Sequence, residues 1–312
     1  MAILFLFLDG VGIGKPGAAN PLDASWPAIE QLAGGQRLTE PLSYILDEHH
    51  TVRAIDATLG VDGLPQSGTG QTALLCGINA PRIAGRHYGP YPHSKTRTQL
   101  TRKNIFSRIL RALSGADEPV AFANAYPDRF FSFAKRRDRW TVTTRCCLDA
   151  GIRIRGEADA RNGSALTADL TGEAWHDKLN IDVGRITPEK AGKRLAAISR
   201  QHAFTLFEYF HTDKAGHSRD HDRARNVLVD IDAFVGALLE ELDPLSDLLL
   251  LCSDHGNLED LEIKTHTRNP VPLIALGAKA DLFHDVTDLT GVTPAIEKAA
   301  VALSNRAISS AS

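Results

Sequence analysis

The chain has 312 residues, of which 43% are hydrophobic and 23% are charged, and its formal net charge is −3 with histidine neutral. These values are typical of a globular protein that can bury a sizeable core, with room for one large domain or a domain carrying an insertion. A chain so close to neutrality gives no electrostatic reason to expect nucleic acid or an anionic membrane as its main partner.

The first predicted element is a strand at Ile3–Leu8, inside the apolar run MAILFLFLDG. This run is too short to span a bilayer, and it lacks the basic start and the small-residue cleavage site of a signal peptide. The four cysteines show no CxxC pair, which suits a reducing compartment. We therefore expect a cytoplasmic protein.

Further short apolar runs predict strands that are buried on both faces. They lie at 120–123, 204–210, 248–252 and 271–276. Amphipathic helical patterns lie between them, with an apolar face repeating through 104–113 and another through 221–242. This alternation predicts an α/β fold with a mostly parallel central sheet and helices on both faces.

The middle of the chain has a different composition. Residues 128–190 are rich in Arg, Asp, Gly and Thr and include a basic run at 135–137. We predict that this segment is a small insertion or cap. Residues 1–127 and 191–312 would then form one discontinuous core.

Three of the predicted strands end in acidic residues. Asp9 follows the first strand, Asp213 follows the strand at 204–210, and Asp254 follows the leucine-rich run at 248–252. A single acid in this position is usually a turn residue or a helix cap. Because open parallel sheets bind ligands beyond the carboxyl ends of their strands, three such ends favour one shared site.

Histidines extend this acidic set. His217 lies four residues after Asp213, a spacing that places both on one face of a helix; His255 follows Asp254 directly, and His266 lies just before the next strand. Together with Asp9, these residues form a set of six nitrogen and oxygen ligands. Such a set suits Zn²⁺ or Mn²⁺ better than Ca²⁺. Six ligands exceed one tetrahedral zinc and match a pair of metal ions, the usual apparatus for attack on phosphoryl groups.

A candidate nucleophile lies in the segment GLPQSGTGQTALLCG. Ser67 stands where a Pro-containing turn passes into a predicted helix, and the glycines beside it let a ligand approach the backbone. Thr69 is a competing hydroxyl, and an N-capping turn would also explain the segment. The chemistry of the residues alone leaves both hydroxyls open.

Five short motifs follow one another from the start of the chain to near its end. They are DGVG at 9–12, QSGTGQT at 66–72, DKAGH at 213–217, SDHGNLE at 253–259 and HTRNPVP at 266–272. In this order they resemble the alkaline phosphatase superfamily and, within it, the branch of cofactor-independent phosphoglycerate mutase and phosphopentomutase. The match leaves only the middle of the chain uncovered.

The resemblance implies a role for seven residues and for two divalent metal ions, Mn²⁺ or Zn²⁺. One ion would be held by Asp9, Ser67, Asp254 and His255, and the other by Asp213, His217 and His266. The resemblance also implies that Ser67, rather than Thr69, becomes phosphorylated. The phosphoryl group would then pass to water or back to a small phosphorylated metabolite.

The chain also departs from its relatives. Phosphoglycerate mutase carries a much longer insertion with an arginine-rich substrate site, for which this chain has no room. The spacing between His255 and His266 resembles phosphopentomutase, whereas the spacing inside DKAGH resembles phosphoglycerate mutase. The resemblance therefore implies a phosphatase or a phosphomutase, and the small cap favours hydrolysis.

Arg82, Arg86 and His87 are candidates for substrate binding, because they crowd the segment after the predicted nucleophile and arginine grips phosphate well. A solvated basic loop is the plainer interpretation. Two other functions stay open: phosphodiester or phosphonate hydrolysis, and a non-catalytic protein that binds metal to regulate a partner.

Overall fold

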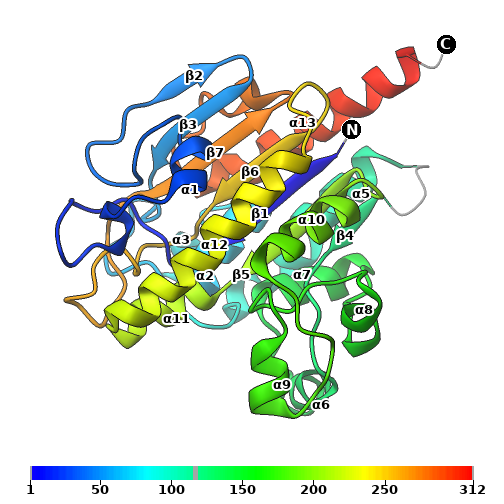
Figure 1. Cartoon of the computed structure of the whole chain (residues 1–312). Coiled ribbons are helices and arrows are strands. Elements are labelled where there is room, and N and C mark those ends of the chain that lie inside the picture. The colour runs from blue at the N-terminus through cyan, green and yellow to red at the C-terminus, as the bar shows by residue number, and fades with distance from the viewer. Residues whose placement is uncertain (1, 115–118, 311–312) are drawn as a thin grey trace.

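A computed structural model describes residues 2–114 and 119–310 of the chain, the last six of these without their side chains. Within this part, seven strands form one sheet in the order β2-β3-β7-β6-β1-β5-β4 (Figure 1). The strands are β1 (Ile3–Leu8), β2 (Ile45–Asp47), β3 (His50–Ile55), β4 (Val120–Phe122), β5 (Phe204–Tyr209), β6 (Leu248–Cys252) and β7 (Val271–Gly277). The α/β class predicted from the sequence is confirmed.

The prediction of a mostly parallel sheet is only partly correct. β4, β5, β1 and β6 run parallel to one another. β7 is antiparallel to β6, β3 is antiparallel to β7, and β2 is antiparallel to β3. Half of the sheet is therefore parallel and buried, and the other half is a set of antiparallel strands at one edge.

Helices cover both faces of the sheet, as the alternation of strands and helices predicts. The described α-helices are α1 (Pro27–Leu32), α2 (Ser67–Cys76), α3 (Ala80–Ala84), α4 (Arg97–Lys103), α5 (Ile105–Ala112), α6 (Asp128–Arg137), α7 (Val142–Ala150), α8 (Glu157–Asn162), α9 (Glu173–Leu179), α10 (Pro188–Ser199), α11 (His211–Ser218), α12 (His221–Glu241) and α13 (Leu289–Ser310). Short 3₁₀ helices lie at Pro21–Asp23, Ser94–Thr96 and Ala280–Phe283. Among these helices, none combines the length and hydrophobicity that a membrane span requires.

The sheet separates two hydrophobic clusters because side chains alternate along each strand. Ile3, Phe5 and Phe7 of β1 face the cluster that includes residues of α2, α4, α5, α7 and α13. Leu4 and Leu6 face the cluster that includes α1, α10 and α12. Figure 1 shows α10 and α12 side by side across this second face.

Residues 128–190 contain α6 to α9, and Figure 1 shows α6, α8 and α9 grouped at one end of the molecule. A small cluster of buried residues, which includes Trp175 and Val183, packs in this part of the chain. α7 instead contributes Val142, Cys146 and Cys147 to the main core. The division into a core and a cap, with its boundaries, stays a prediction.

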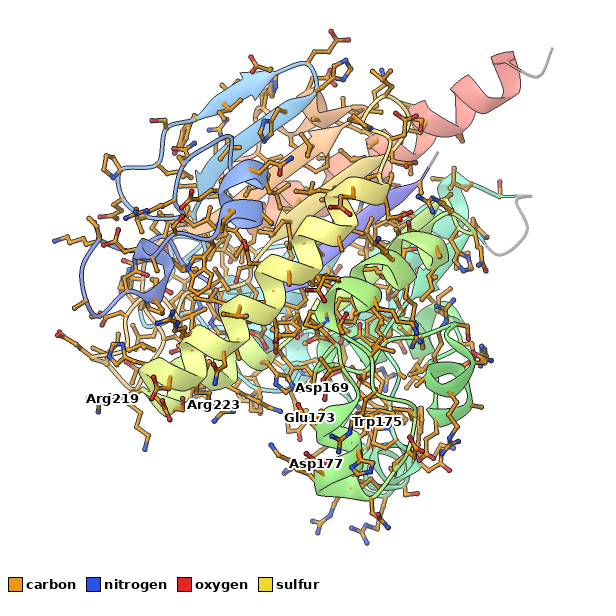
Figure 2. All side chains as sticks on the ribbon, in the orientation of Figure 1. Asp169, Glu173, Trp175, Asp177, Arg219 and Arg223 are labelled. Carbon is orange, nitrogen blue, oxygen red and sulfur yellow. The ribbon has the colours of Figure 1, made fainter. Side chains whose placement is uncertain are left out.

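Charged side chains lie where α9 approaches α11 and α12. Figure 2 shows Asp169, Glu173 and Asp177 in or near α9, and Arg219 and Arg223 near the start of α12. Burial lowers the pKa of Lys214 on α11, and so do the positive charges of Arg223 on α12 and Lys178 on α9. The three cations therefore lie close enough to interact across this junction.

We predict that Leu250→Ala in the middle of β6 lowers the free energy of unfolding by about 2–5 kcal/mol, because it opens a cavity between two packed layers. Leu250 has no exposed surface. Urea denaturation would measure the loss. The control is Leu245→Ala at a leucine that is 72% exposed, which should change stability by less than about 0.5 kcal/mol. Equal effects of the two substitutions would contradict this packing.

Candidate metal centre

The candidate site lies at the carboxyl ends of three adjacent parallel strands. β1 is hydrogen-bonded to β5 on one side and β6 on the other, with Leu8 opposite Tyr209 and Phe7 opposite Cys252. Asp9, the start of α11 and the segment 253–255 consequently leave the sheet at the same edge. The structure thus brings together the three strand ends that the sequence placed in one crevice.

Four side chains form a first group of candidate ligands near the ends of β1 and β6. They belong to Asp9, Ser67, Asp254 and His255. The Oγ of Ser67 lies 3.0 Å from Nε2 of His255. The same nitrogen lies 3.4 Å from Oδ1 of Asp9 and 3.5 Å from Oδ2 of Asp254. Asp9, Asp254 and His255 are buried, so these contacts are shielded from bulk water.

The second group comprises Asp213, His217 and His266. Nε2 of His217 lies 3.1 Å from Nε2 of His266. Oxygens of Asp213 lie 3.5 Å from the first of these nitrogens and 3.6 Å from the second. Ligand atoms of the three residues lie within 4.8 Å of one another, a spacing that can hold one metal ion.

The two groups adjoin one another. The rings of His255 and His266 stack with their centroids 3.8 Å apart. Asp213 also comes within 4.8 Å of ligand atoms of both Asp9 and His255, so it reaches both groups. The resemblance assigns Asp213 to the ion of His217 and His266, and the structure also places it near Asp9 and His255.

The residues of the site fit a bound cation. Oδ1 of Asp9 and Oδ2 of Asp254 are buried and have no hydrogen-bond partner among the described residues. Burial raises the pKa of Asp9, and so do the charges of Asp254 and Asp213. Burial also lowers the pKa of His255 and of His266, which favours their neutral forms. Crowded carboxylates without donors and neutral imidazoles are the combination that a divalent metal stabilises.

Glu259 joins the loops that carry these side chains, and the sequence prediction missed it. Its buried carboxylate accepts hydrogen bonds from the backbone N–H groups of Gly12 and Asn257, at 2.9 and 2.8 Å. It also accepts from the hydroxyl of Thr267 and, at 3.0 Å, from the side-chain amide of Asn269. One carboxylate therefore fixes the loops after β1 and β6 and the loop beyond His266.

Asn257 orients a candidate ligand and was also missed. Its side-chain amide donates to Oδ1 of Asp213 at 2.6 Å and to the backbone oxygen of the same residue at 3.0 Å. Both Asn257 and Glu259 lie in the motif SDHGNLE, two and four positions beyond His255, the last residue there with obvious metal chemistry. Only their hydrogen bonds to distant parts of the chain show that Glu259 connects the loops and that Asn257 holds Asp213.

Two glycines allow backbone to approach the candidate ligands. Gly10 has φ of +71°, and a Cβ at this position would lie 2.7 Å from Oδ1 of Asp213. A Cβ at Gly70 of α2 would lie 2.7 Å from the backbone oxygen of Asp254. Side chains at either position would therefore push the strand-end acids out of place.

The two candidate hydroxyls have different environments. Thr69 is buried, and its backbone N–H donates to the oxygen of Tyr88 at 2.8 Å, while its hydroxyl accepts from the N–H of Tyr88 at 3.1 Å. Thr69 thus holds the loop of residues 86–91 against the start of α2. Ser67 instead borders a hollow of about 400 Å³ that Asp213, His217 and His266 also line.

The three candidate substrate-binding residues divide into two sets. Arg86 and His87 line a second hollow of about 440 Å³. Arg82 lies in α3, and its backbone N–H donates to the side chain of Asn79, which caps the helix. Arg82 lines neither of these two hollows. The structure therefore brings two of the three near the candidate nucleophile.

We predict that Asn257→Ala weakens metal binding by about 10- to 100-fold, because Asp213 loses the donor that fixes its orientation. Titration of metal-free protein with Mn²⁺ or Zn²⁺ by calorimetry would measure the change. Asn162→Ala on the exposed end of α8 is the control and should bind metal as the unaltered protein does. Unchanged affinity in Asn257→Ala would show that this contact does not position a ligand.

Two solved structures have a fold similar to that of this chain. The PH0037 protein from Pyrococcus horikoshii has a similar structure, with a TM-score of 0.56, 12% identity and 97% of both chains covered. Alkaline phosphatase from the Antarctic bacterium TAB5 gives a TM-score of 0.50 at 14% identity, covering 97% of this chain and 98% of that one. At such low identity these likenesses concern the fold alone.

Curated relatives in sequence are 2,3-bisphosphoglycerate-independent phosphoglycerate mutases. The protein of Vibrio parahaemolyticus is 33% identical over 116 residues, which cover 35% of this chain and 23% of the mutase. The protein of Haloarcula marismortui is 30% identical over 111 residues, covering 32% and 21%. The matched segment thus spans less than a quarter of either mutase.

A match over nearly the whole chain comes from a family model. The model of the Metalloenzyme superfamily covers residues 1–298, which include all seven of the clustered candidate residues. The chain therefore belongs to the Metalloenzyme superfamily.

Proposed function

We propose that this protein is a two-metal phosphoryl-transfer enzyme, a phosphatase or a phosphomutase, that acts on a small phosphorylated metabolite through a phosphoserine at Ser67. The observation that carries the proposal is the position of Ser67. Its hydroxyl lies 3.0 Å from His255 in a cluster of buried carboxylates and imidazoles and borders an open hollow. Membership of a family of metalloenzymes and the similarity to phosphoglycerate mutases support it.

The proposal divides the ligands between two adjoining positions. Asp9, Asp254, His255 and Ser67 would hold one cation, His217 and His266 would hold the other, and Asp213 lies within reach of both. When bound, Mn²⁺ or Zn²⁺ would neutralise phosphoryl oxygens and make the Ser67 hydroxyl easier to deprotonate.

The protein's own residues would position the reacting groups. α2 begins at Ser67, so the positive end of its helix dipole lies beside the nucleophile, where it favours an anion. Oγ of Ser67 would attack phosphorus in line, and the bond between phosphorus and the leaving oxygen would break. Because His255 would be engaged as a ligand, the Ser67 proton would pass to water in the open hollow, and water would protonate the leaving oxygen.

Two outcomes of the second step separate a phosphatase from a phosphomutase. Water would attack the phosphoserine in a phosphatase, whereas a hydroxyl of the retained substrate would attack it in a phosphomutase. Both restore the Ser67 hydroxyl. The hollow beside Ser67 is open to solvent, which favours access of water and hence hydrolysis.

We predict that Ser67→Ala lowers kcat with p-nitrophenyl phosphate by on the order of 10³-fold or more, because no hydroxyl remains to accept the phosphoryl group. The same variant should keep most of its Mn²⁺ or Zn²⁺, since the other ligands are unchanged. Turnover, metal content and the mass of acid-quenched protein would be measured together. The unaltered protein should show one added phosphoryl group on the peptide that contains Ser67.

The matched control is Thr69→Ser, which keeps a hydroxyl to bind Tyr88 and should stay active. Full activity of Ser67→Ala, or phosphorylation of Thr69, would contradict the assignment of the nucleophile. If metal-loaded protein turned over no aryl phosphate, phosphodiester or phosphosugar and acquired no phosphate on Ser67, the enzymatic proposal itself would be wrong.

A further inference from the structure

Two hollows adjoin one another beside the candidate nucleophile. The first, of about 400 Å³, is lined by Ser67 and by the ligand group of Asp213, His217 and His266. The second, of about 440 Å³, extends along the loop of residues 86–89. Leu64, Gln66 and Gly89 line both, so the two share one wall and a single elongated ligand could occupy both.

Arg86 lines the second hollow and is exposed. Within residues 2–114 and 119–310, the guanidinium of Arg86 makes no hydrogen bond and no ion pair; it lies 5.8 Å from the centre of the Tyr88 ring. An arginine offers five N–H donors arranged to bind a carboxylate or a phosphate. The N–H groups of Arg86 are therefore exposed to the second hollow and available to a ligand.

His87 has a different part in this hollow. Burial lowers its pKa, and the nearby charge of Arg268 lowers it further, so the imidazole is neutral at neutral pH. Its Nε2 lies 3.2 Å from the backbone oxygen of Val61, which suits an N–H donating to that carbonyl. His87 thus joins the 86–89 loop to the 61–64 segment. It contributes to the shape of the second hollow and adds no positive charge to it.

The remaining charges favour an anion. Arg268 donates from Nη1 to the backbone oxygen of Gly63 at 2.7 Å, so a second guanidinium lies against the wall. Lys264 lines the first hollow. Asp62 is the acidic residue that lines the second hollow, and it is exposed. Arg86 and Asp62 are thus the charged residues that line the second hollow, and Arg268 adds a positive charge behind its wall.

Contacts with the helix of Ser67 fix the loop that carries Arg86. Thr69 binds both the N–H and the carbonyl of Tyr88. A Cβ at Gly68 would lie 2.1 Å from the backbone oxygen of Tyr91, so the loop packs directly on the start of α2. The backbone of the loop that carries Arg86 is consequently held against the start of the helix that carries Ser67.

We infer that the substrate carries a second anionic group, a carboxylate or a phosphate, and that Arg86 binds this group in the second hollow while the transferred phosphoryl group lies beside Ser67. This inference rests on the proposed function, because it takes the first hollow as the phosphoryl site. It restricts the substrate to metabolites that carry a phosphoryl ester and a further acidic group. Arg86 would thereby determine specificity without taking part in the chemistry.

Calorimetric titration of the Mn²⁺-loaded protein with unreactive phosphonates tests the inference without turnover. Propylphosphonate carries one acidic group, 3-phosphonopropionate adds a carboxylate, and propane-1,3-bisphosphonate adds a second phosphonate. Longer members of both series, with up to five methylene groups, vary the separation between the two acidic groups. We expect the best diacid to bind at least about tenfold more tightly than the monoacid of the same length. The preferred series identifies the second group as carboxylate or phosphate.

Four variants test the part played by Arg86. Arg86→Gln should remove the advantage of the diacid and leave binding of propylphosphonate unchanged, and Arg86→Lys should keep part of it. Asp62→Asn should strengthen diacid binding by about two- to fivefold, because a repulsive charge is lost. Arg225→Gln removes an exposed charge on α12, outside both hollows, and should change nothing.

The outcomes separate this inference from the proposed function. If propylphosphonate binds but no diacid binds more tightly, or if the advantage survives in Arg86→Gln, the second hollow does not bind an anion and the phosphoryl site stands. If propylphosphonate itself fails to bind the metal-loaded protein, the first hollow is not a phosphoryl site, and both the inference and the proposed function fail.

Discussion

Repulsion between carboxylates at the end of the parallel strands is the constraint on which the site depends. Asp9 and Asp254 are buried, Asp213 lies beside them, and one oxygen of each of the first two has no hydrogen-bond donor among the described residues. Such an arrangement costs free energy unless protons or a cation offset the charge. Burial lowers the pKa of His255 and of His266 and so favours their neutral forms, which leaves a divalent metal as the charge that suits the set. Belonging to the Metalloenzyme superfamily agrees with this electrostatic interpretation.

The fold supplies the rigidity that this crowding requires. β1 lies between β5 and β6, and each of the three strands is buried along its length. Their ends therefore have little freedom to move apart. Beyond the strands, Glu259 ties the loops together with four hydrogen bonds, and Asn257 fixes Asp213. The geometry of the candidate site thus depends on Asn257 and Glu259 as well as on the candidate ligands.

Much of the parallel half of the sheet could be predicted from the sequence, because a strand buried on both faces appears as a continuous apolar run. β1 and β6 have the predicted bounds, and β5 ends one residue earlier than predicted. β2 and β3 were missed, since they are short or only partly buried and have no such run. The direction of β7 was also beyond prediction, because nothing in an apolar run encodes which way a strand points.

The candidate site shows a similar division. Asp and His residues at strand ends carry recognisable metal chemistry, so seven of the clustered side chains were named from the sequence; their roles as ligands and nucleophile stay a proposal. Asn257 and Glu259 act through hydrogen bonds to loops far away in the chain, which only the folded structure brings near. Arg86 and Arg82 look equivalent in the sequence, yet only Arg86 lines a hollow next to Ser67.

Anomalous diffraction from crystals grown with Mn²⁺ or Zn²⁺ would test the central claim most directly. Our account predicts two peaks about 3.5–4 Å apart, the separation usual in two-metal sites. One peak should lie among Asp9, Asp254, His255 and Ser67, the other beside His217 and His266, with Asp213 in contact with at least one of them. A single peak, or metal bound away from Ser67, would contradict the two-metal account.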